Sequence, residues 1–215
     1  ARIIQERPQQ AAPALRKIPD LEGAIEKHRL WLQGDPKGVR ADLSYSDLAN
    51  ADFRVACMRK ASFRGADLTG ANMRGVNVSH ADMREACLDE VHMQGGFARG
   101  ADFSHARMRG VVMERAYLRD AILDGAIVTD ACFSQCDMRD MRADGATFDG
   151  VRFEHITGDM GFMDQAVACG CEREQASPTS PARPRLRDAG ARCKGASAMR
   201  TTDPRTTPTL EEKER

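Results

Sequence analysis

The apolar residues between positions 43 and 153 recur at every fifth position without an insertion. Of the 23 positions in this series, 21 hold Leu, Phe, Met or Val. Two residues before each of them the side chain is usually small, being Ala at 15 positions and Val at four. Neither the 3.6-residue period of an α-helix nor the two-residue period of a flat strand keeps such a series on one side. The pattern therefore predicts a solenoid in which every five residues form one short strand and a turn.

Strand alternation turns the small and the large residue of each unit inward and the residue between them outward. Pairs such as Ala51 with Phe53 fit a narrow interior that accepts one large side chain and one methyl group on each face. The corners are expected two residues after the large one, where a turn favours Gly, Asn or Asp. The glycines at such positions include Gly65, Gly70, Gly75, Gly100, Gly110, Gly125, Gly145 and Gly150.

Three successive units resemble the A-(D/N)-L-x-x repeat of the pentapeptide-repeat family. They are Ala61-Ser62-Phe63-Arg64-Gly65, Ala66-Asp67-Leu68-Thr69-Gly70 and Ala71-Asn72-Met73-Arg74-Gly75. The resemblance covers about half of the chain. It implies an all-β solenoid, a right-handed quadrilateral β-helix with four repeats per coil, so that 23 repeats make nearly six coils. With roughly 4.8 Å between coils, the rod would be about 28 Å long.

The segments outside the repeats are expected to flank or close the solenoid. Residues 1–19 are predicted to be a flexible N-terminal segment, and residues 20–40 a capping helix and lead-in that covers the first strand edge. Residues 41–155 form the predicted β-helix and residues 156–171 an irregular C-terminal cap. Residues 172–215 hold five prolines and no aromatic residue, which predicts a disordered tail.

The start of the capping helix has a clear signal, because Asp20 can serve as its N-cap, and Gly34 follows its expected end. The lead-in, with Glu26-Lys27-His28-Arg29-Leu30-Trp31-Leu32, is similar to lead-ins of bacterial members of the family. We interpret His28 and Trp31 as parts of a lid rather than as binding residues.

Composition favours a cytoplasmic protein that depends on neither nucleic acid nor a membrane. The chain holds 32 basic and 32 acidic residues, lacks an apolar run of membrane-spanning length, and shows no secretory signal in residues 1–19. Seven scattered cysteines argue against a disulfide framework, and the pair Cys169 and Cys171 is too little for a zinc site.

Nothing in the sequence indicates an enzyme. The inward positions are almost all apolar, so they leave no room for a substrate, and the outward positions make convex ribs. The five histidines do not cluster, because the four within the repeats fall on different coils and mostly on different faces, which argues against a metal site. No phosphate-binding glycine loop or nucleophile motif is present. We therefore expect no catalytic residue and no cofactor.

Function is expected on the outside, and one face combines aromatic and arginine side chains. If residues 20 apart stack, Phe97 and Tyr117 stand one coil apart with Arg99, Arg119 and Arg139 beside them. This composition dominates protein-binding hot spots. Stacked arginines and aromatics also stabilise a ladder by packing alone, which is the alternative interpretation.

A second predicted feature is an exposed apolar patch on the adjacent faces. Val112, Ile122 and Ile127 replace the usual Asp or Asn at the outward position, and together they would form a partner site at the middle coils. The interior departs from its pattern nearby, since Gly96 with Ala98 underfills one face. Met141 with Ala143 reverses the usual order of small and large.

These observations favour a non-enzymatic scaffold that binds an unidentified protein through the outer faces of its β-helix. The family resemblance implies an alternative, because some members protect or inhibit DNA gyrase by imitating duplex DNA. That imitation needs a strongly negative surface, whereas positions 41–155 hold 18 acidic and 14 basic residues. Direct nucleic-acid binding is a third hypothesis, opposed by the acids among the arginines.

Overall fold

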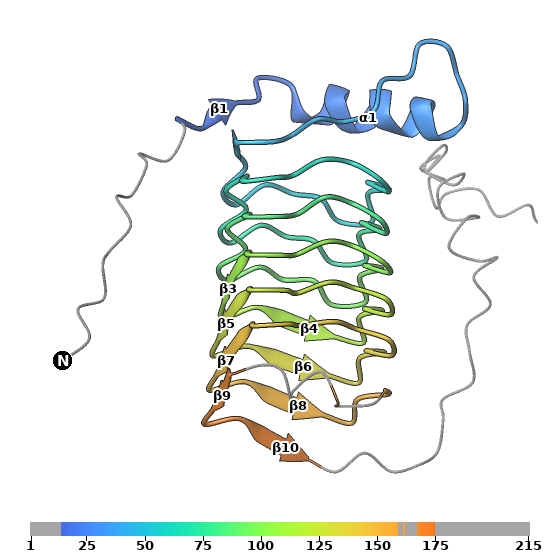
Figure 1. The fold of residues 1–215 in the computed structure, drawn as a ribbon. Coiled ribbons are helices and arrows are strands. Elements are labelled where there is room, and N and C mark those ends of the chain that lie inside the picture. Colours follow the sequence, from blue (N-terminus) through green and yellow to red (C-terminus); the bar gives the residue numbers. More distant parts are fainter. Residues whose placement is uncertain (1–13, 159–160, 162–166, 175–215) are drawn as a thin grey trace, which may run out of the picture. The chain divides into compact units, whose positions relative to one another are not determined.

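The computed structural model describes residues 14–158, 161 and 167–174 (Figure 1). All of them lie in the first of two units into which the chain divides, Ala1–Pro181. The second unit, Ala182–Arg215, lies outside the described residues. Within the first unit the chain winds into stacked coils, and helix α1 (Leu21–Leu32) lies across their N-terminal end.

The register of the coils confirms the quadrilateral β-helix. Outward residues pair in parallel with the residue 20 positions later, as Asp42 does with Ser62 and Asn77 with Phe97. Since each repeat has five residues, a 20-residue register means four repeats per coil. Backbone hydrogen bonds join consecutive coils along every face: the N–H of Leu43 donates to the carbonyl of Ser62 at 2.7 Å.

From residue 107 onward, repeats on two of the faces form three-residue strands, which make two parallel sheets. One sheet has the order β3-β5-β7-β9 and the other β10-β8-β6-β4, and a short pair, β1 with β2, lies near the N-terminal end. The strands are β1 (Arg16–Lys17), β2 (Ser46–Asp47), β3 (Arg107–Arg109), β4 (Val112–Glu114), β5 (Ile127–Thr129), β6 (Cys132–Ser134), β7 (Thr147–Asp149), β8 (Arg152–Glu154), β9 (Val167–Cys169) and β10 (Glu172–Glu174).

The interior is a continuous apolar core made by the small and large inward residues. Phe53, Phe63 and Phe103 are fully buried. The alanines two residues before Phe63 and Phe103 are also fully buried, whereas Ala51 before Phe53 is partly buried. Aromatic rings meet inside the core, where Phe133 stacks on Phe153 with ring centroids 5.5 Å apart. This packing is the main source of stability, because each coil buries its apolar face only against its neighbours.

The corners have one backbone conformation throughout. Every fifth residue from Tyr45 to His155 has a positive φ, which is 14 residues other than glycine and nine glycines. This left-handed conformation costs a β-branched residue most, so Val55, with φ of 52° and 77% of its surface exposed, is a strained corner. The turn is therefore imposed by the coil as a whole and not by glycine at each site.

The N-terminal end is closed by α1 and its lead-in, as the sequence predicts. The side chain of Asp20 accepts a hydrogen bond from the N–H of Gly23 at 2.7 Å, and Gly34 follows the helix with φ of 78°. Residues 1–19 are predicted to be a flexible segment, and the structure describes its last part, residues 14–19. This part is ordered, because β1 pairs with β2. The guanidinium of Arg16 also donates to the carbonyl of Ser44 at 2.7 Å. Residues 1–13 lie outside the described residues.

The solenoid continues further than the sequence analysis expected. β9 pairs with β7 and β10 with β8, each in the same 20-residue register, so the predicted boundary at residue 155 is too early. The reason is that the inward pattern persists weakly: Cys171 occupies a small inward position, packs against the core, and its thiol lies 3.5 Å from the carbonyl of Phe148. The predicted tail consequently begins no earlier than residue 175, and its remaining residues lie outside the described part.

Candidate functional site

Each side of the β-helix presents one column of outward side chains, and we name the four faces after the first residue of each column. The Asp42 face carries Asp42, Ser62, Asp82, Asp102, Ile122 and Arg142; the Asp47 face carries Asp47, Asp67, Cys87, Arg107, Ile127 and Thr147. The Asp52 face carries Asp52, Asn72, His92, Val112, Cys132 and Arg152; the Cys57 face carries Cys57, Asn77, Phe97, Tyr117, Asp137 and Thr157.

The Cys57 face brings the two predicted aromatic residues together. The rings of Phe97 and Tyr117 stack with centroids 5.0 Å apart and planes inclined by 5°. The backbone sets this geometry, because the two residues form a parallel bridge between successive coils. Each side chain is half-buried, so the pair presents a rigid aromatic surface at little further cost in conformational entropy.

Three arginines border the aromatic pair, and acids hold each of them. Arg99 lies 3.0 Å from the carboxylate of Asp120, and Arg119 lies 3.2 Å from that of Asp140. Arg139 donates through Nε to Asp137 at 2.7 Å. The three side chains keep between 33% and 41% of their surface exposed. The guanidinium groups are therefore oriented in advance but still open to a partner.

The charge pairing also shifts the acidity of the groups involved. Burial alone would raise the pKa of Asp137, but hydrogen bonds from the side chain and backbone of Arg139 outweigh it, and the net pKa lies below its ordinary value. The same side-chain hydrogen bond raises the pKa of Arg139. Both groups therefore keep their charges at neutral pH.

The structure does not bring the three predicted aliphatic residues into one patch. Val112 belongs to the Asp52 face, Ile122 to the Asp42 face and Ile127 to the Asp47 face, so each looks out from a different side. The prediction of a joint apolar site is wrong, because the coil turns a corner every five residues. Ile127 alone is well exposed, at 52% of its surface.

The space beside Gly96, one of the interior departures, is filled by a neighbouring side chain. A Cβ atom at Gly96 would lie 2.6 Å from Cγ of Met93, which shows that the methionine side chain occupies the space left by the glycine. Met141 and Ala143 are both buried despite their reversed order, at 8% and 1% exposure. Met93 therefore compensates for the missing side chain at Gly96, and Met141 stays inside the core.

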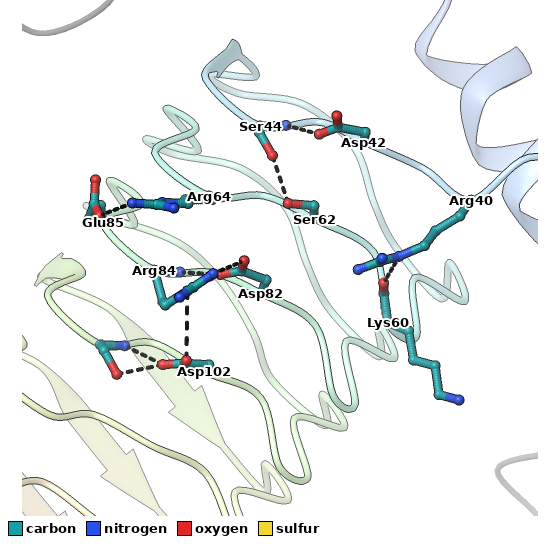
Figure 2. A network of polar contacts seen from close by, with 11 residues as sticks. Arg40, Asp42, Ser44, Lys60, Ser62, Arg64, Asp82, Arg84, Glu85 and Asp102 are labelled. Atoms are coloured by element: carbon teal, nitrogen blue, oxygen red, sulfur yellow. Dashed lines mark hydrogen bonds and ion pairs between the residues drawn. The ribbon is translucent and has the colours of Figure 1, made fainter.

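The Asp42 face has a salt-bridge ladder that sequence reasoning missed (Figure 2). Arg64 lies 2.8 Å from Glu85, and Arg84 lies 2.6 Å from Asp82 and 3.8 Å from Asp102. The hydrogen bond from Arg84 is the main cause of the lowered pKa of Asp82. The signal in the sequence is an acid and a base 2 residues apart on one strand, or 18 or 21 residues apart on successive coils, and the second kind becomes visible once the four-repeat coil is known.

The sequence analysis assigns His28 to the lid but does not predict its buried contacts. It is fully buried between α1 and the first coil, and its ring stacks on Trp31 with centroids 5.4 Å apart. Nδ1 accepts a hydrogen bond from the N–H of Ala41 at 2.9 Å, which leaves Nε2 to donate to the carbonyl of Arg59 at 3.0 Å. His28 thus ties the lid to the first coil.

A metal-binding cluster and a membrane-spanning helix are both absent from the described residues. No group of three or more His, Cys, Asp or Glu side chains lies close enough together in this part of the chain to hold a metal ion. The described part also has no helix with the length and apolar character needed to span a membrane.

Comparison with known proteins identifies the repeat. A family model described as "Pentapeptide repeats" matches in 8 copies, over residues 39–75, 56–95 and 99–135. No curated protein sequence matches the chain significantly.

Solved structures of pentapeptide repeat proteins are also similar to the chain. One, from the thylakoid lumen of Arabidopsis thaliana, is 31% identical; the match covers 47% of this chain and 63% of that protein, with a TM-score of 0.22. HetL from Nostoc sp. strain PCC 7120, involved in heterocyst differentiation regulation, is 19% identical over 63% of this chain and 71% of its own, with a TM-score of 0.33.

QnrB1, a plasmid-mediated fluoroquinolone resistance protein, is 14% identical over 64% of this chain and 92% of its own, with a TM-score of 0.21. The chain spans less than two thirds of the length of the Arabidopsis protein. TM-scores this low give no ground for transferring a function.

Proposed function

The chain belongs to the pentapeptide-repeat proteins, and from that premise we propose that it is a non-enzymatic scaffold that binds another protein through the outside of its β-helix. The observation that carries the proposal is the stack of Phe97 on Tyr117, bordered by three arginines that acids hold in place. Aromatic and arginine side chains that are ordered before binding lose little entropy on association, which is typical of hot spots.

The interior supports the same proposal. The inward side chains form one apolar cluster that runs through the coils, so the described residues offer their chemistry only on the outer faces. A scaffold needs no pocket, because protein interfaces are broad and are built around a few anchoring residues. Phe97, Tyr117, Arg99, Arg119 and Arg139 are the anchors that we propose.

Gyrase binding by imitation of DNA is the alternative that the family resemblance implies. Duplex DNA is negative along its whole length, whereas the repeats from residue 41 to residue 155 carry a net charge of only −4. The acids are also unevenly placed. When whole repeats are counted, corners included, the repeats of the Asp42 and Asp47 faces hold 12 acidic and five basic residues. The repeats of the other two faces hold six acidic and nine basic residues. This distribution favours the scaffold over the alternative.

The proposal is tested by affinity capture from a native lysate, with captured proteins identified by mass spectrometry. The bait Tyr117→Ala with Arg119→Ala is compared with the wild-type chain. The control bait, Tyr45→Ala with Arg64→Ala, removes one aromatic and one arginine from the Asp42 face. Circular dichroism and urea unfolding check that each bait is folded.

We expect a specific protein that the wild type and the control capture and the first variant loses. Equal capture by all three baits would place the site elsewhere, and no specific capture would overturn the scaffold. Gyrase subunits among the captured proteins would favour the alternative.

A further inference from the structure

The first three coils are electrically polarised across the rod. On the Asp52 and Cys57 faces, residues 51–60, 71–80 and 91–100 contain five basic residues and one acidic residue, a net charge of +4. On the other two faces of the same coils, residues 41–50, 61–70 and 81–90 contain seven acidic and two basic residues. We define the basic patch by the five basic residues Arg54, Arg59, Lys60, Arg74 and Arg99.

We propose that this basic patch binds an extended, acidic segment of a protein partner. The inference rests on the proposed function and names the chemistry of the partner. The one acid within the patch, Asp52, is already occupied, because it pairs with Arg54 at 2.6 Å. Arg59, Lys60 and Arg74 are exposed and form no ion pair with any side chain in the described part of the chain, so their charges are available.

The corner between the two faces leaves room for a peptide backbone. The corner column runs from the exposed Val55 to Gly75 and Gly95. A Cβ atom at Gly75 would lie 3.2 Å from Cγ1 of Val55, whereas one at Gly95 would meet nothing within 4 Å. A partner segment can therefore approach the backbone at Gly95, on the third coil. Val55 offers an apolar contact on the first coil, and the ring of Phe97 lies on the third coil.

The size of the patch favours a short peptide over nucleic acid. Three coils spaced by roughly 4.8 Å place the first and third about 10 Å apart, which three to five extended residues span. On the next two coils, residues 116–120 and 136–140 of the Cys57 face hold two basic and three acidic residues, so a longer phosphate backbone following this face would meet no net positive charge there. An acidic segment limited to the first three coils meets the positive charge alone.

The test uses fluorescence anisotropy with a fluorescein-labelled octapeptide of glutamates around one central tyrosine. The same octapeptide with glutamine in place of glutamate is the control probe, and labelled oligothymidylate is the nucleic-acid probe. The patch variant combines Arg59→Ala, Lys60→Ala and Arg74→Ala. The matched variant combines Arg109→Ala, Arg115→Ala and Arg152→Ala, which changes the net charge equally at exposed positions outside the patch.

We expect the patch variant to bind the glutamate peptide at least tenfold more weakly than the wild type, and the matched variant to stay within twofold. Equal weakening in both variants would show an effect of net charge only and would overturn the inference. The inference would also be overturned if the wild type did not bind the glutamate peptide more tightly than the glutamine peptide. If oligothymidylate bound more tightly than the glutamate peptide, nucleic acid and not an acidic segment would be the ligand of the patch.

Failure of this inference can be told apart from failure of the scaffold by using the patch variant as a capture bait. A specific partner kept by the patch variant but lost with Tyr117→Ala and Arg119→Ala would leave the scaffold standing and overturn the basic patch. Absence of any specific partner of the wild type would overturn the scaffold itself.

Discussion

Replacing His28 by leucine removes the link between the lid and the first coil. Leucine fills much of the space of the imidazole but can neither accept from the N–H of Ala41 nor donate to the carbonyl of Arg59. A buried backbone group without a partner costs about 1–3 kcal/mol. Two such groups lower the free energy of unfolding by about 2–6 kcal/mol in His28→Leu, which urea unfolding followed by circular dichroism measures.

The same residue makes stability depend on pH. Burial lowers the pKa of His28, the carbonyl of Arg59 opposes the shift, and the nearby charge of Arg40 adds to it. The unfolded chain therefore takes up the proton first, near its ordinary pKa of about 6.5. Stability from the neutral ring is fully present above that pH and is lost as pH falls toward the lowered pKa. His28→Leu should abolish this loss.

His80→Asn is the control for both measurements. His80 is an exposed corner residue with φ of 58°, a conformation that asparagine tolerates. This variant should keep the wild-type dependence on pH, because its His28 is intact. Hydrogen exchange should be faster in α1 and at the Ala41 amide in His28→Leu only. A loss below about 0.5 kcal/mol together with an unchanged pH dependence would refute the role assigned to His28.

Four further substitutions test the packing. Gly38→Ala places a Cβ atom 2.0 Å from the backbone nitrogen of Trp31, so we expect the lid to separate from the first coil and hydrogen exchange in α1 to become faster. Unchanged protection of α1 would contradict this close contact. Gly145→Ala meets nothing within 4 Å but keeps a φ of 68°, so urea unfolding should show a loss of about 1–2 kcal/mol from backbone strain alone. Phe133→Ala in the core should cost about 3–5 kcal/mol, whereas Ile127→Ala at an exposed position should cost less than about 0.5 kcal/mol; similar losses in the two variants would contradict the assignment of inside and outside.

The sequence was sufficient for the fold because the interior repeats without interruption. The series from Leu43 to Phe153 has no insertion, so the inward and outward positions could be assigned residue by residue. The left-handed corners could be predicted at glycines but not at Val55, where the neighbouring coils hold the backbone in a conformation that valine disfavours. The limits of the solenoid were missed, since β10 keeps the register although its residues no longer resemble the repeat.

The outer surface was less predictable, because it depends on which side chains meet across coils. The stack of Phe97 on Tyr117 follows from the 20-residue register once four repeats per coil are assumed. The pairing of Arg99 with Asp120 depends on rotamers that the repeat pattern does not determine. The predicted apolar patch failed because side chains on adjacent faces point to different sides of the coil, and of the three only Ile127 is well exposed.

The most direct test of the central claim, that the Cys57 face binds a protein partner, is site-specific photocrosslinking. One chain carries Tyr117→p-benzoylphenylalanine and a second carries Tyr45→p-benzoylphenylalanine on the Asp42 face. After irradiation in a native lysate, we predict a crosslinked protein at position 117 that is absent or much weaker at position 45. A partner that crosslinks only at position 45, or equally at both positions, would contradict the claim.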